Sequence, residues 1–288
     1  MTTAYYFLTI ALMTPVEYEF LSEFLRDRSG LSLGNDRHYL LKSRLEPLAH
    51  SRELDGLSTL VTHLRGGKDP TLESAVVDAM TTNETSFLRD RTPFEEFKSV
   101  ILPALREARR TTRSIRVWSA ACSTGQEPRS LAMMLAESLP DVRSWDIQIV
   151  ATDISQRVLD RAKAGEYSAI EVQRGLPAQL LVKYFEQAVA SYRVRPELRD
   201  MIEWRQLNLF DSFTSLGTFD VIFCRNVLIY FEVSDKADIL TRLQHQLAPE
   251  GCLFLGGAET VLGITDKFGK HPDCKAAVYV PANATARV

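Results

Sequence analysis

The sequence predicts an α/β protein with a doubly wound, largely parallel sheet, preceded by a small all-helical region. Three observations predict this arrangement. Apolar runs typical of buried strands alternate with helical patterns from residue 115 onward. Residues 115–130, IRVWSAACSTGQEPRS, read as a strand, a tight turn and a helix, the unit that places a small ligand at the carboxyl end of a strand in such sheets. Residues 14–80 show helical periodicity and no strand pattern.

Four amphipathic helices are expected in residues 14–80. The first starts at a T-x-x-E capping box with proline at the first helical position. The residues expected to cap or end the helices are Thr14, Gly30, Asn35, Asp36, Gly66, Gly67 and Thr71. The second helix is expected to carry Tyr39, Leu41, Leu45 and Leu48 on its apolar side and Arg37, Lys42 and Arg44 outside. Together these helices predict a small bundle.

The remainder of the chain is expected to supply the sheet. After the polar segment 81–90, TTNETSFLRD, a long helix through Phe94 to Leu105 has a basic surface, either a solvated face or a partner-binding patch. Further strands are expected at residues 146–153, 204–210, 219–224, 252–256 after a turn at 249–251, and 276–280, the last at an edge of the sheet. Residues 165–199 are too long for one connection and indicate an insertion, with a helix over 176–185 and a hairpin arm over 190–194.

The totals exclude several classes of protein. The chain has 288 residues, a net charge of −3 and a pI of about 6.0, which argues against a dedicated nucleic-acid binder. Its four cysteines lack C-x-x-C spacing, so we expect neither a metal site nor a disulfide framework, and a reducing cytoplasm is the default. The apolar stretch 4–13 is too short to span a bilayer and lacks signal-peptide features. Residues 1–12 are either an extension ahead of a natural start at Met13 or a weak surface helix.

Two acidic residues at strand ends indicate a nucleoside pocket. The turn after the first strand lacks both G-x-G-x-x-G and a P-loop lysine, so it does not indicate a pyrophosphate site. Glu127 instead places a carboxylate there, which favours a cationic or zwitterionic ligand. Asp153 ends the second strand roughly 30 residues beyond the first, about where such folds hold a ribose. The alternative for Asp153 is a helix N-cap, because residues 155–163 read as a helix.

Six motifs in this order and spacing resemble the chemotaxis-receptor glutamate O-methyltransferases of the CheR type. They are TTNETSFLRD, RVWSAACSTGQEP, VATDIS, QLNLF, FDVIFCRNVLIYF and LFLGGAE, and the resemblance runs from about Val16 to Val280. It implies a Rossmann-like S-adenosylmethionine-dependent methyltransferase sheet with an N-terminal all-α bundle and a small inserted β-subdomain. The expected domains are residues 1–90 and 91–288, with the inserted subdomain at about 165–199.

The resemblance also implies the activity, the cofactor and the partner. S-adenosyl-L-methionine would be the cofactor and S-adenosyl-L-homocysteine the product. The substrate would be a glutamate side chain on the cytoplasmic signalling helices of a chemoreceptor (methyl-accepting chemotaxis protein), which becomes a methyl ester during adaptation. We therefore expect a cytoplasmic, monomeric enzyme that neither binds nucleic acid nor inserts into the membrane.

The family's site residues carry over by matching position. The implied cofactor contacts are Asn83, Thr85, Arg89, Glu127, Asp153, Asn208, Leu209, Arg225 and Asn226. Arg89 and Tyr230 are the implied catalytic residues: Arg89 positions the carboxylate of the substrate or of the cofactor, and Tyr230 donates a hydrogen bond near the reacting methyl. The alternatives are a surface ion pair of Arg89 with Asp90 or Glu84, and a core position for Tyr230.

The chain departs from the family pattern at two positions of the motif GQEPR. Gln126 stands where an acid is usual and removes a charge that would attract the sulfonium. Arg129 stands where a tyrosine is common, on the first turn of a helix, and a compensating pairing with Glu127 is expected.

Two further features concern the receptor. The helix with Arg37, Lys42 and Arg44 resembles the family's receptor-facing basic helix. The short, glycine-free stretch between Phe185 and Tyr192 resembles members that do not use a receptor C-terminal peptide as a tether.

Two other functions were weighed against the expected one. Nucleic-acid methylation would call for an N-P-P-Y-like run after the fourth strand, where this chain has CRNVLIYF. A regulatory protein that binds cofactor and receptor without turnover is the non-enzyme alternative, motivated by Gln126 and Arg129.

Overall fold

The chain folds into two compact units, residues 1–81 and 82–288, each with its own hydrophobic core. The structure is a computed structural model, and it describes residues 13–34, 37–139 and 141–282. Among these described residues, no helix combines the length and the apolar character needed to cross a membrane.

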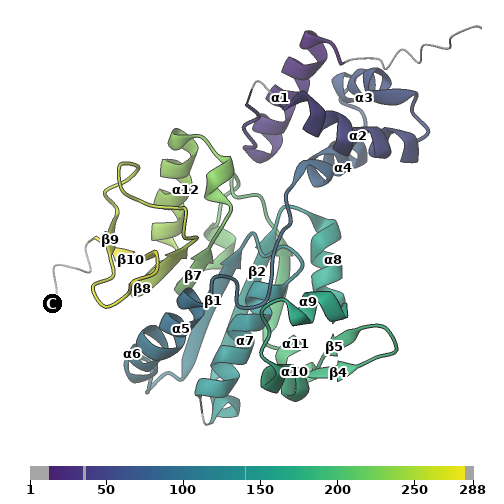
Figure 1. Cartoon of the computed structure of the whole chain (residues 1–288). Helices are drawn as coiled ribbons and strands as arrows, with labels where there is room; N and C mark the ends of the chain where they lie inside the picture. The colour runs from purple at the N-terminus through teal and green to yellow at the C-terminus, as the bar shows by residue number, and fades with distance from the viewer. Residues whose placement is uncertain (1–12, 35–36, 140, 283–288) are drawn as a thin grey trace, which may run out of the picture. The chain divides into compact units, whose positions relative to one another are not determined.

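The first unit is the expected helical bundle (Figure 1). Its helices are α1 (Pro15–Ser29), α2 (His38–Ser51), α3 (Gly56–Arg65) and α4 (Pro70–Met80). They enclose an apolar core built largely of leucines spaced three or four residues apart. The most deeply buried members are Leu21, Leu25, Leu41, Leu45, Ala49, Leu60 and Val76.

The helix ends follow the expected capping chemistry with one correction. The capping box at the start of α1 is confirmed, because Thr14 and Glu17 exchange hydrogen bonds, and Gly30 ends the helix at φ 70°. The fourth helix is capped by Asp69 and not by Thr71, because the Asp69 carboxylate accepts the amides of Thr71 and the next residue, with proline at the first helical position. The proposed caps at residues 35–36 lie outside the described residues, and the N-cap position of α2 is occupied by Arg37, which makes no side-chain capping bond.

Two positions of α2 differ from the expected helical faces. Tyr39 is 71% exposed, so it does not belong to the apolar side. Arg44 is not an outward charge, because its Nη1 donates to the carbonyls of Met80 at 2.7 Å and Thr81 at 3.0 Å. The guanidinium thus satisfies carbonyls at the end of α4, where a cation also interacts favourably with the helix dipole.

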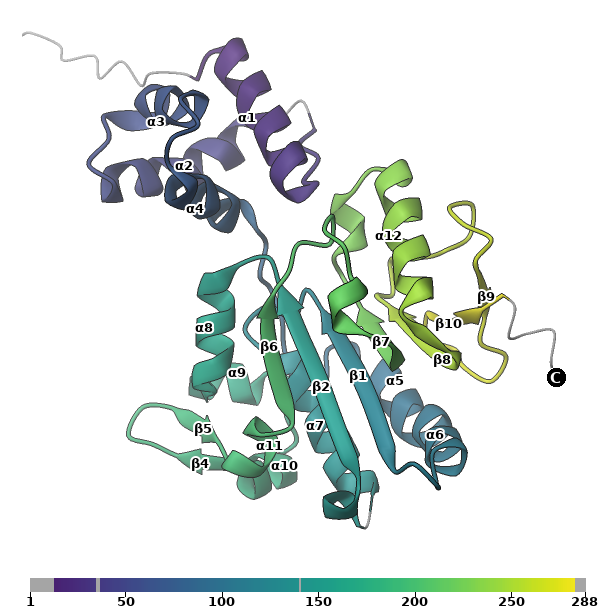
Figure 2. The same cartoon turned by 180° about the vertical axis from the view of Figure 1, so that it is seen from behind.

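The second unit is built on a seven-stranded sheet with the order β6-β2-β1-β7-β8-β10-β9 (Figure 2). The strands are β1 (Ser114–Ala120), β2 (Asp146–Asp153), β6 (Ile202–Gln206), β7 (Phe219–Cys224), β8 (Leu247–Leu255), β9 (Phe268–Lys270) and β10 (Val278–Pro281). The first five pair in parallel, and β10 pairs antiparallel with β8 and β9. Since β1 lies between β2 and β7, the carboxyl ends of these three strands adjoin one another, the usual place for a ligand in such a sheet.

Three strand boundaries differ from the expected ones. The strand β10 lies between β8 and β9, so the edge of the sheet is β9 and not residues 276–280. The strand expected at residues 204–210 is β6, which ends at Gln206, before the QLNLF motif is complete. The segment 249–251 belongs to β8 and produces a register shift against β7, where a separate turn was expected.

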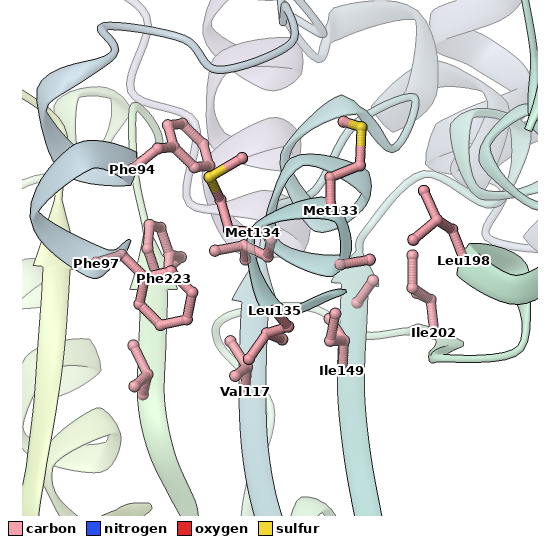
Figure 3. Close-up of a cluster of buried hydrophobic side chains, with 14 of the residues drawn as sticks. Phe94, Phe97, Val117, Met133, Met134, Leu135, Ile149, Leu198, Ile202 and Phe223 are labelled. Atoms are coloured by element: carbon pink, nitrogen blue, oxygen red, sulfur yellow. The ribbon is translucent and has the colours of Figure 1, made fainter. Parts of the chain in front are cut away.

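Helices cover both faces of this sheet. One face carries α5 (Thr92–Glu96), a π-helical turn (Phe97–Ile101), α6 (Leu102–Ala108), α7 (Gln126–Ser138) and α8 (Gln156–Ala164), and the other carries α12 (Val233–His245). Figure 3 shows Phe94 and Phe97 packed on Phe223, beside Met134 and the strands. The Phe223 ring stacks on Phe254 at a centroid distance of 4.3 Å, and the Phe97 ring meets both at an edge.

Two of the five arginines on and after the long helix, Arg109 and Arg116, are satisfied within the chain, whereas Arg106, Arg110 and Arg113 are exposed, as expected for a solvated face. Arg109 forms ion pairs with Asp220 and Glu250, each at 2.8 to 2.9 Å. The guanidinium of Arg116 donates to the carbonyls of Leu216 and Thr218. These arginines therefore fasten α6 and β1 to the neighbouring strands, which favours neither a free solvated face nor a partner patch at these positions.

The insertion forms the expected small β-subdomain. Its strands β3 (Glu166–Tyr167), β4 (Phe185–Gln187) and β5 (Tyr192–Val194) make an antiparallel sheet with the order β3-β5-β4. Its helices are α9 (Ala169–Gln173), α10 (Ala178–Tyr184) and α11 (Pro196–Arg199). The ring of Phe87 packs edge-on against Tyr167 and Phe185, which anchors this subdomain to the segment that precedes α5.

Candidate functional site

The turn after β1 depends on left-handed backbone. Ala121 and Ser123 have φ values of 54° and 51°, and Gly125 has a φ of 92°. A Cβ on Gly125 would lie 2.9 Å from the side chains of both Ala162 and Trp204. Glycine is therefore required there by conformation and by packing, and α7 starts directly after this turn.

A buried ion pair links the carboxyl ends of β1 and β7. Glu127 Oε1 accepts the hydroxyl of Ser119 at 2.8 Å, and its Oε2 accepts Nη1 of Arg225 at 3.0 Å. The second guanidinium nitrogen of Arg225 donates to Asp90 Oδ2 at 2.7 Å and to the carbonyl of Arg89 at 3.0 Å. The side chains of Arg225 and Glu127 are only 1% and 13% exposed, so this pairing is well shielded from solvent.

The electrostatic environment of Glu127 favours a ligand with a positive group. Burial raises the pKa of Glu127, while the charge of Arg225 and the hydrogen bond from Ser119 partly oppose that rise. The nearby carboxylate of Glu259 adds to the rise. A positive group placed beside Glu127 would relieve both the burial cost and this repulsion, which fits the zwitterionic ligand expected from the sequence.

Asp153, at the end of β2, is fixed by backbone amides on both sides. Its Oδ2 accepts the amide of Ser123 at 2.8 Å, and its Oδ1 accepts the amide of Ser155 at 3.0 Å. The N-cap of α8 is Ser155, whose hydroxyl accepts the amide of Val158. Asp153 is therefore not the capping residue of that helix, and its carboxylate is held at the end of β2 by the amides of Ser123 and Ser155.

The segment 82–91 is held against the strand ends by three anchors. The hydroxyl of Ser123 donates to the carbonyl of Asn83 at 2.8 Å, and the amide of Leu88 donates to the hydroxyl of Ser130 at 3.0 Å. The third anchor is Arg225, described above. Left-handed φ values at Leu88, Asp90 and Arg91 show that this path is imposed by those contacts, since such residues rarely adopt them.

Arg89 and Tyr230 lie half-buried, on the segment 82–91 and on the loop after β7. The guanidinium of Arg89 donates to the carbonyl of Glu84 at 2.8 Å, and Arg89 is among the charges that lower the pKa of the exposed Glu84 carboxyl, after Arg174. Within the described residues, no hydrogen bond occupies the hydroxyl of Tyr230. Neither residue thus takes a fully buried or fully surface position.

The QLNLF motif contributes a short loop after β6. Asn208 Oδ1 accepts the amide of Phe210 at 3.1 Å, which orients the amide side chain. The side chain of Leu209 is 6% exposed and belongs to the core beneath the loop. Only the backbone of Leu209 is therefore free to serve as the cofactor contact that the motif implies.

Part of the implied set is connected through shared hydrogen-bond partners. Asn83 and Asp153 share Ser123 as a partner, while Glu127 and Arg89 share Arg225.

Arg129 does not pair with Glu127, contrary to expectation. It is 0% exposed and donates to the carbonyls of Ala162 at 3.2 Å and Leu198 at 3.3 Å, with its guanidinium over the ring of Trp204. The insertion and α8 close over this position and supply those carbonyls, so Arg129 fastens α7 to the ends of α8 and α11. Burial lowers the pKa of Arg129 as a result.

One buried acid at this edge was not singled out from the sequence. Glu259 is 7% exposed and accepts four backbone amides from the loops after β7 and β8. The available signal was an acid placed directly after an apolar strand and two glycines, in LFLGGAE.

Comparison with known proteins identifies the class to which this fold and site belong. The model described as "CheR methyltransferase, SAM binding domain" matches residues 83–276, and the one described as "CheR methyltransferase, all-alpha domain" matches residues 16–81. The molecule is an S-adenosylmethionine-dependent methyltransferase.

Its relatives are chemotaxis proteins. The chain is 44% identical over 260 residues to chemotaxis protein methyltransferase 1 of Pseudomonas aeruginosa, covering 88% of this chain and 93% of that one. It is 41% identical to chemotaxis protein methyltransferase Cher2 of Pseudomonas putida, with 88% and 93% covered, and 39% identical to the chemotaxis protein methyltransferase of Vibrio parahaemolyticus, with 91% and 95% covered. The chain belongs to the CheR methyltransferase family, and the expected family and cofactor are confirmed.

The residues at the strand ends fit S-adenosylmethionine. Asp153 and Glu127 are carboxylates held in place by protein hydrogen bonds, which is the chemistry that ribose hydroxyls and an ammonium group require. Arg225 Nε is buried and has no hydrogen-bond partner among the described residues, although both terminal nitrogens of the guanidinium donate to protein oxygens. A carboxylate such as that of the methionine moiety would satisfy this N–H.

Proposed function

We propose that this protein methylates glutamate side chains on the cytoplasmic signalling helices of a chemoreceptor, giving glutamate methyl esters for adaptation in chemotaxis-type signalling. The observation that carries the proposal is the buried Glu127–Arg225 pair beside the fixed carboxylate of Asp153, at adjoining ends of β1, β7 and β2 in a chain of the CheR family.

The cofactor would be gripped along its length by the residues carried over from the family. Asp153 would accept the ribose hydroxyls, Glu127 would bind the methionine ammonium, and Arg225 and Arg89 would bind the methionine carboxylate. Asn208 and the backbone of Leu209 suit an adenine edge, and Asn83, Thr85 and Asn226 complete the enclosure. The support is geometric: Ser123 joins Asn83 to Asp153, and Arg225 joins Glu127 to Arg89, so that five of these nine positions lie in two hydrogen-bonded groups.

The chemistry makes small demands on acid or base groups. A glutamate of the receptor, with an ordinary pKa of about 4.3, is already a carboxylate nucleophile at neutral pH. When bound, S-adenosylmethionine supplies an activated methyl on an excellent leaving group. The protein has to hold the three reacting atoms in line, which can contribute roughly 7 to 11 kcal/mol. Arg89 would orient the incoming carboxylate through its planar fork, and the Tyr230 hydroxyl would donate a hydrogen bond close to the methyl.

The receptor surface of the protein is expected to include part of α2. Methylation helices of receptors are acidic, which matches the exposed Arg37 directly ahead of α2 and the partly exposed Lys42, whose ammonium lies 3.6 Å from Glu46. Arg44 is excluded from this face because it binds the end of α4. The loop between β4 and β5 in the insertion is short, which supports action without a peptide tether.

The test uses purified protein, tritiated S-adenosylmethionine and receptor-containing membranes. Base-labile label in the receptor is the expected result, and Arg89→Ala should reduce it by about a hundredfold or more. Arg106→Ala, which removes an exposed arginine of α6, is the matched control and should methylate normally. Label in nucleic acid, or cofactor binding without any transfer, would contradict the proposal. Near-normal turnover by Arg89→Ala would remove Arg89 from its role while leaving the reaction itself in place.

A further inference from the structure

Glu259 binds the loops after two neighbouring strands through backbone amides alone. Its Oε1 accepts the amides of Val227 at 2.9 Å and Leu228 at 2.7 Å. Its Oε2 accepts the amides of Asn226 at 2.8 Å and Gly256 at 2.6 Å. The side chain is nearly buried, so all four bonds are shielded from water.

The chemistry of this arrangement is specific to a carboxylate. A carboxylate is acceptor-only and has about four lone-pair sites, which here meet four donors. A glutamine at this position would place an NH₂ group against two N–H donors, and those amides would become buried and unsatisfied. An aspartate is one methylene shorter and cannot span both loops from the same backbone position.

Gly256 and Asn226 show how tightly this junction is built. Asn226 has a left-handed φ of 59°, a conformation that Asn tolerates better than most residues but still adopts rarely. A Cβ on Gly256 would lie 2.7 Å from both Asn226 Nδ2 and Glu259 Oε2. Asn226 is thus confined by its own amide bond to Glu259 on one side and by the bare backbone of Gly256 on the other.

The loop held in this way carries residues that the proposed function needs. It starts directly after Arg225, which pairs with Glu127, and it continues through Asn226 into the short 3₁₀ turn Leu228–Tyr230. Glu259 itself is not among the residues carried over from the family as cofactor contacts. Its four bonds reach the site only through the backbone of these neighbours.

We infer that Glu259 is a positioning residue that holds Asn226 and Tyr230 in the geometry required for cofactor binding and methyl transfer. This inference rests on the proposed function, because it assigns Glu259 to the reaction that Asn226 and Tyr230 serve. Glu259 acts by fixing the backbone between them, and it touches neither cofactor nor substrate.

The test compares the Glu259→Gln variant with the wild-type protein, by steady-state methylation kinetics and by calorimetric binding of S-adenosylhomocysteine. We expect the KM for S-adenosylmethionine and the Kd for S-adenosylhomocysteine to rise about tenfold or more, kcat to fall, and the KM for receptor to stay unchanged. The matched control is Glu107→Gln, an exposed acid of α6 that should leave all four constants unchanged. A merely structural role would reduce the active fraction, and thus the apparent kcat, without moving either cofactor constant. Wild-type cofactor constants in a folded Glu259→Gln protein would overturn the inference.

A second measurement keeps the inference testable should that variant not fold. Hydrogen exchange of the wild-type protein reports on the amides of Asn226, Val227 and Leu228, and we expect their protection to increase when S-adenosylhomocysteine is added. Exchange at these amides that is fast and insensitive to S-adenosylhomocysteine would also overturn the inference. If the wild-type protein transfers no methyl group to receptor, the proposed function fails first; if it does, and Glu259→Gln matches it, only the positioning role fails.

Discussion

Replacing Arg225 with methionine should destabilise the second unit, because the carboxylates of Asp90 and Glu127 then lose their cationic partner. The guanidinium is 1% exposed and bonds to Glu127, Asp90 and the carbonyl of Arg89. Methionine replaces the apolar stem of the side chain but not the guanidinium, which lies over the ring of Phe94 at 5.5 Å. The measured effect therefore combines the lost charge with the lost packing of the guanidinium.

The loss of unfolding free energy depends on how exposed the two unpaired carboxylates are. Breaking a fully buried ion pair costs about 3 to 5 kcal/mol because one charge remains uncompensated. Asp90 is half-exposed and regains water, whereas Glu127 is 13% exposed and does not, so we expect the lower end, about 3 kcal/mol. In a domain of this size that loss lowers the Tm by roughly 6 to 12 °C. Thermal unfolding at neutral pH, followed by circular dichroism or calorimetry, measures it.

The pH dependence of stability and a second substitution distinguish the uncompensated charge of Glu127 from simple cavity formation. Loss of Arg225 removes an influence that lowers the pKa of Glu127, so Glu127 protonates more readily and the deficit should shrink as the pH falls toward about 5. The double variant Arg225→Met/Glu127→Gln should be more stable than Arg225→Met alone at pH 7. A double variant that is no more stable, or a single variant with the wild-type Tm, would refute the reasoning.

Three other outcomes are expected. Arg89→Ala should reduce receptor methylation by about a hundredfold or more, and Tyr230→Phe by about tenfold, with the label incorporated from tritiated cofactor as the measure; wild-type rates would disprove either role. The Kd for S-adenosylhomocysteine should rise as the pH is lowered from about 8 to 5, because protonation of Glu127 removes its attraction for the ammonium. This loss begins above pH 4.5 because burial raises the pKa of Glu127. The Glu127→Gln variant should bind S-adenosylhomocysteine more weakly at high pH and lose the pH dependence, and an unchanged pH profile in this variant would contradict the assignment. Calorimetry should detect no binding of receptor C-terminal peptides to the inserted subdomain, and measurable affinity would establish a tether.

The parts of the site that follow from local sequence could be predicted. The apolar run, the small residues and Gly125 define β1, its turn and α7 within one short stretch, and Asp153 marks the end of the next strand. Each of these features depends on the period of the pattern and on turn chemistry, which are properties of neighbouring residues. The capping error at α4 was local too, because Pro70 at the first helical position pointed to Asp69 as the cap.

The parts that depend on packing between distant segments could not be predicted. Arg129 occupies a helical position typical of the surface, but the insertion and α8 close over it and supply its carbonyl partners. The role of Glu259 depends on β7 and β8 being neighbours, so that one side chain reaches amides more than 30 positions away in the chain. Nothing in the periodicity of either segment encodes that proximity.

The anchoring of residues 82–91 has a consequence for dissecting the protein into fragments. This stretch leads out of the helical bundle, yet its own contacts are with Ser123, Ser130 and Arg225 of the catalytic unit. A fragment that starts at Arg91 would discard Asn83 and the carbonyl that Arg225 grips, whereas one that starts at Thr82 keeps both. We expect only the longer fragment to retain S-adenosylhomocysteine, so the border that matters for ligand retention runs just after the last helix of the bundle.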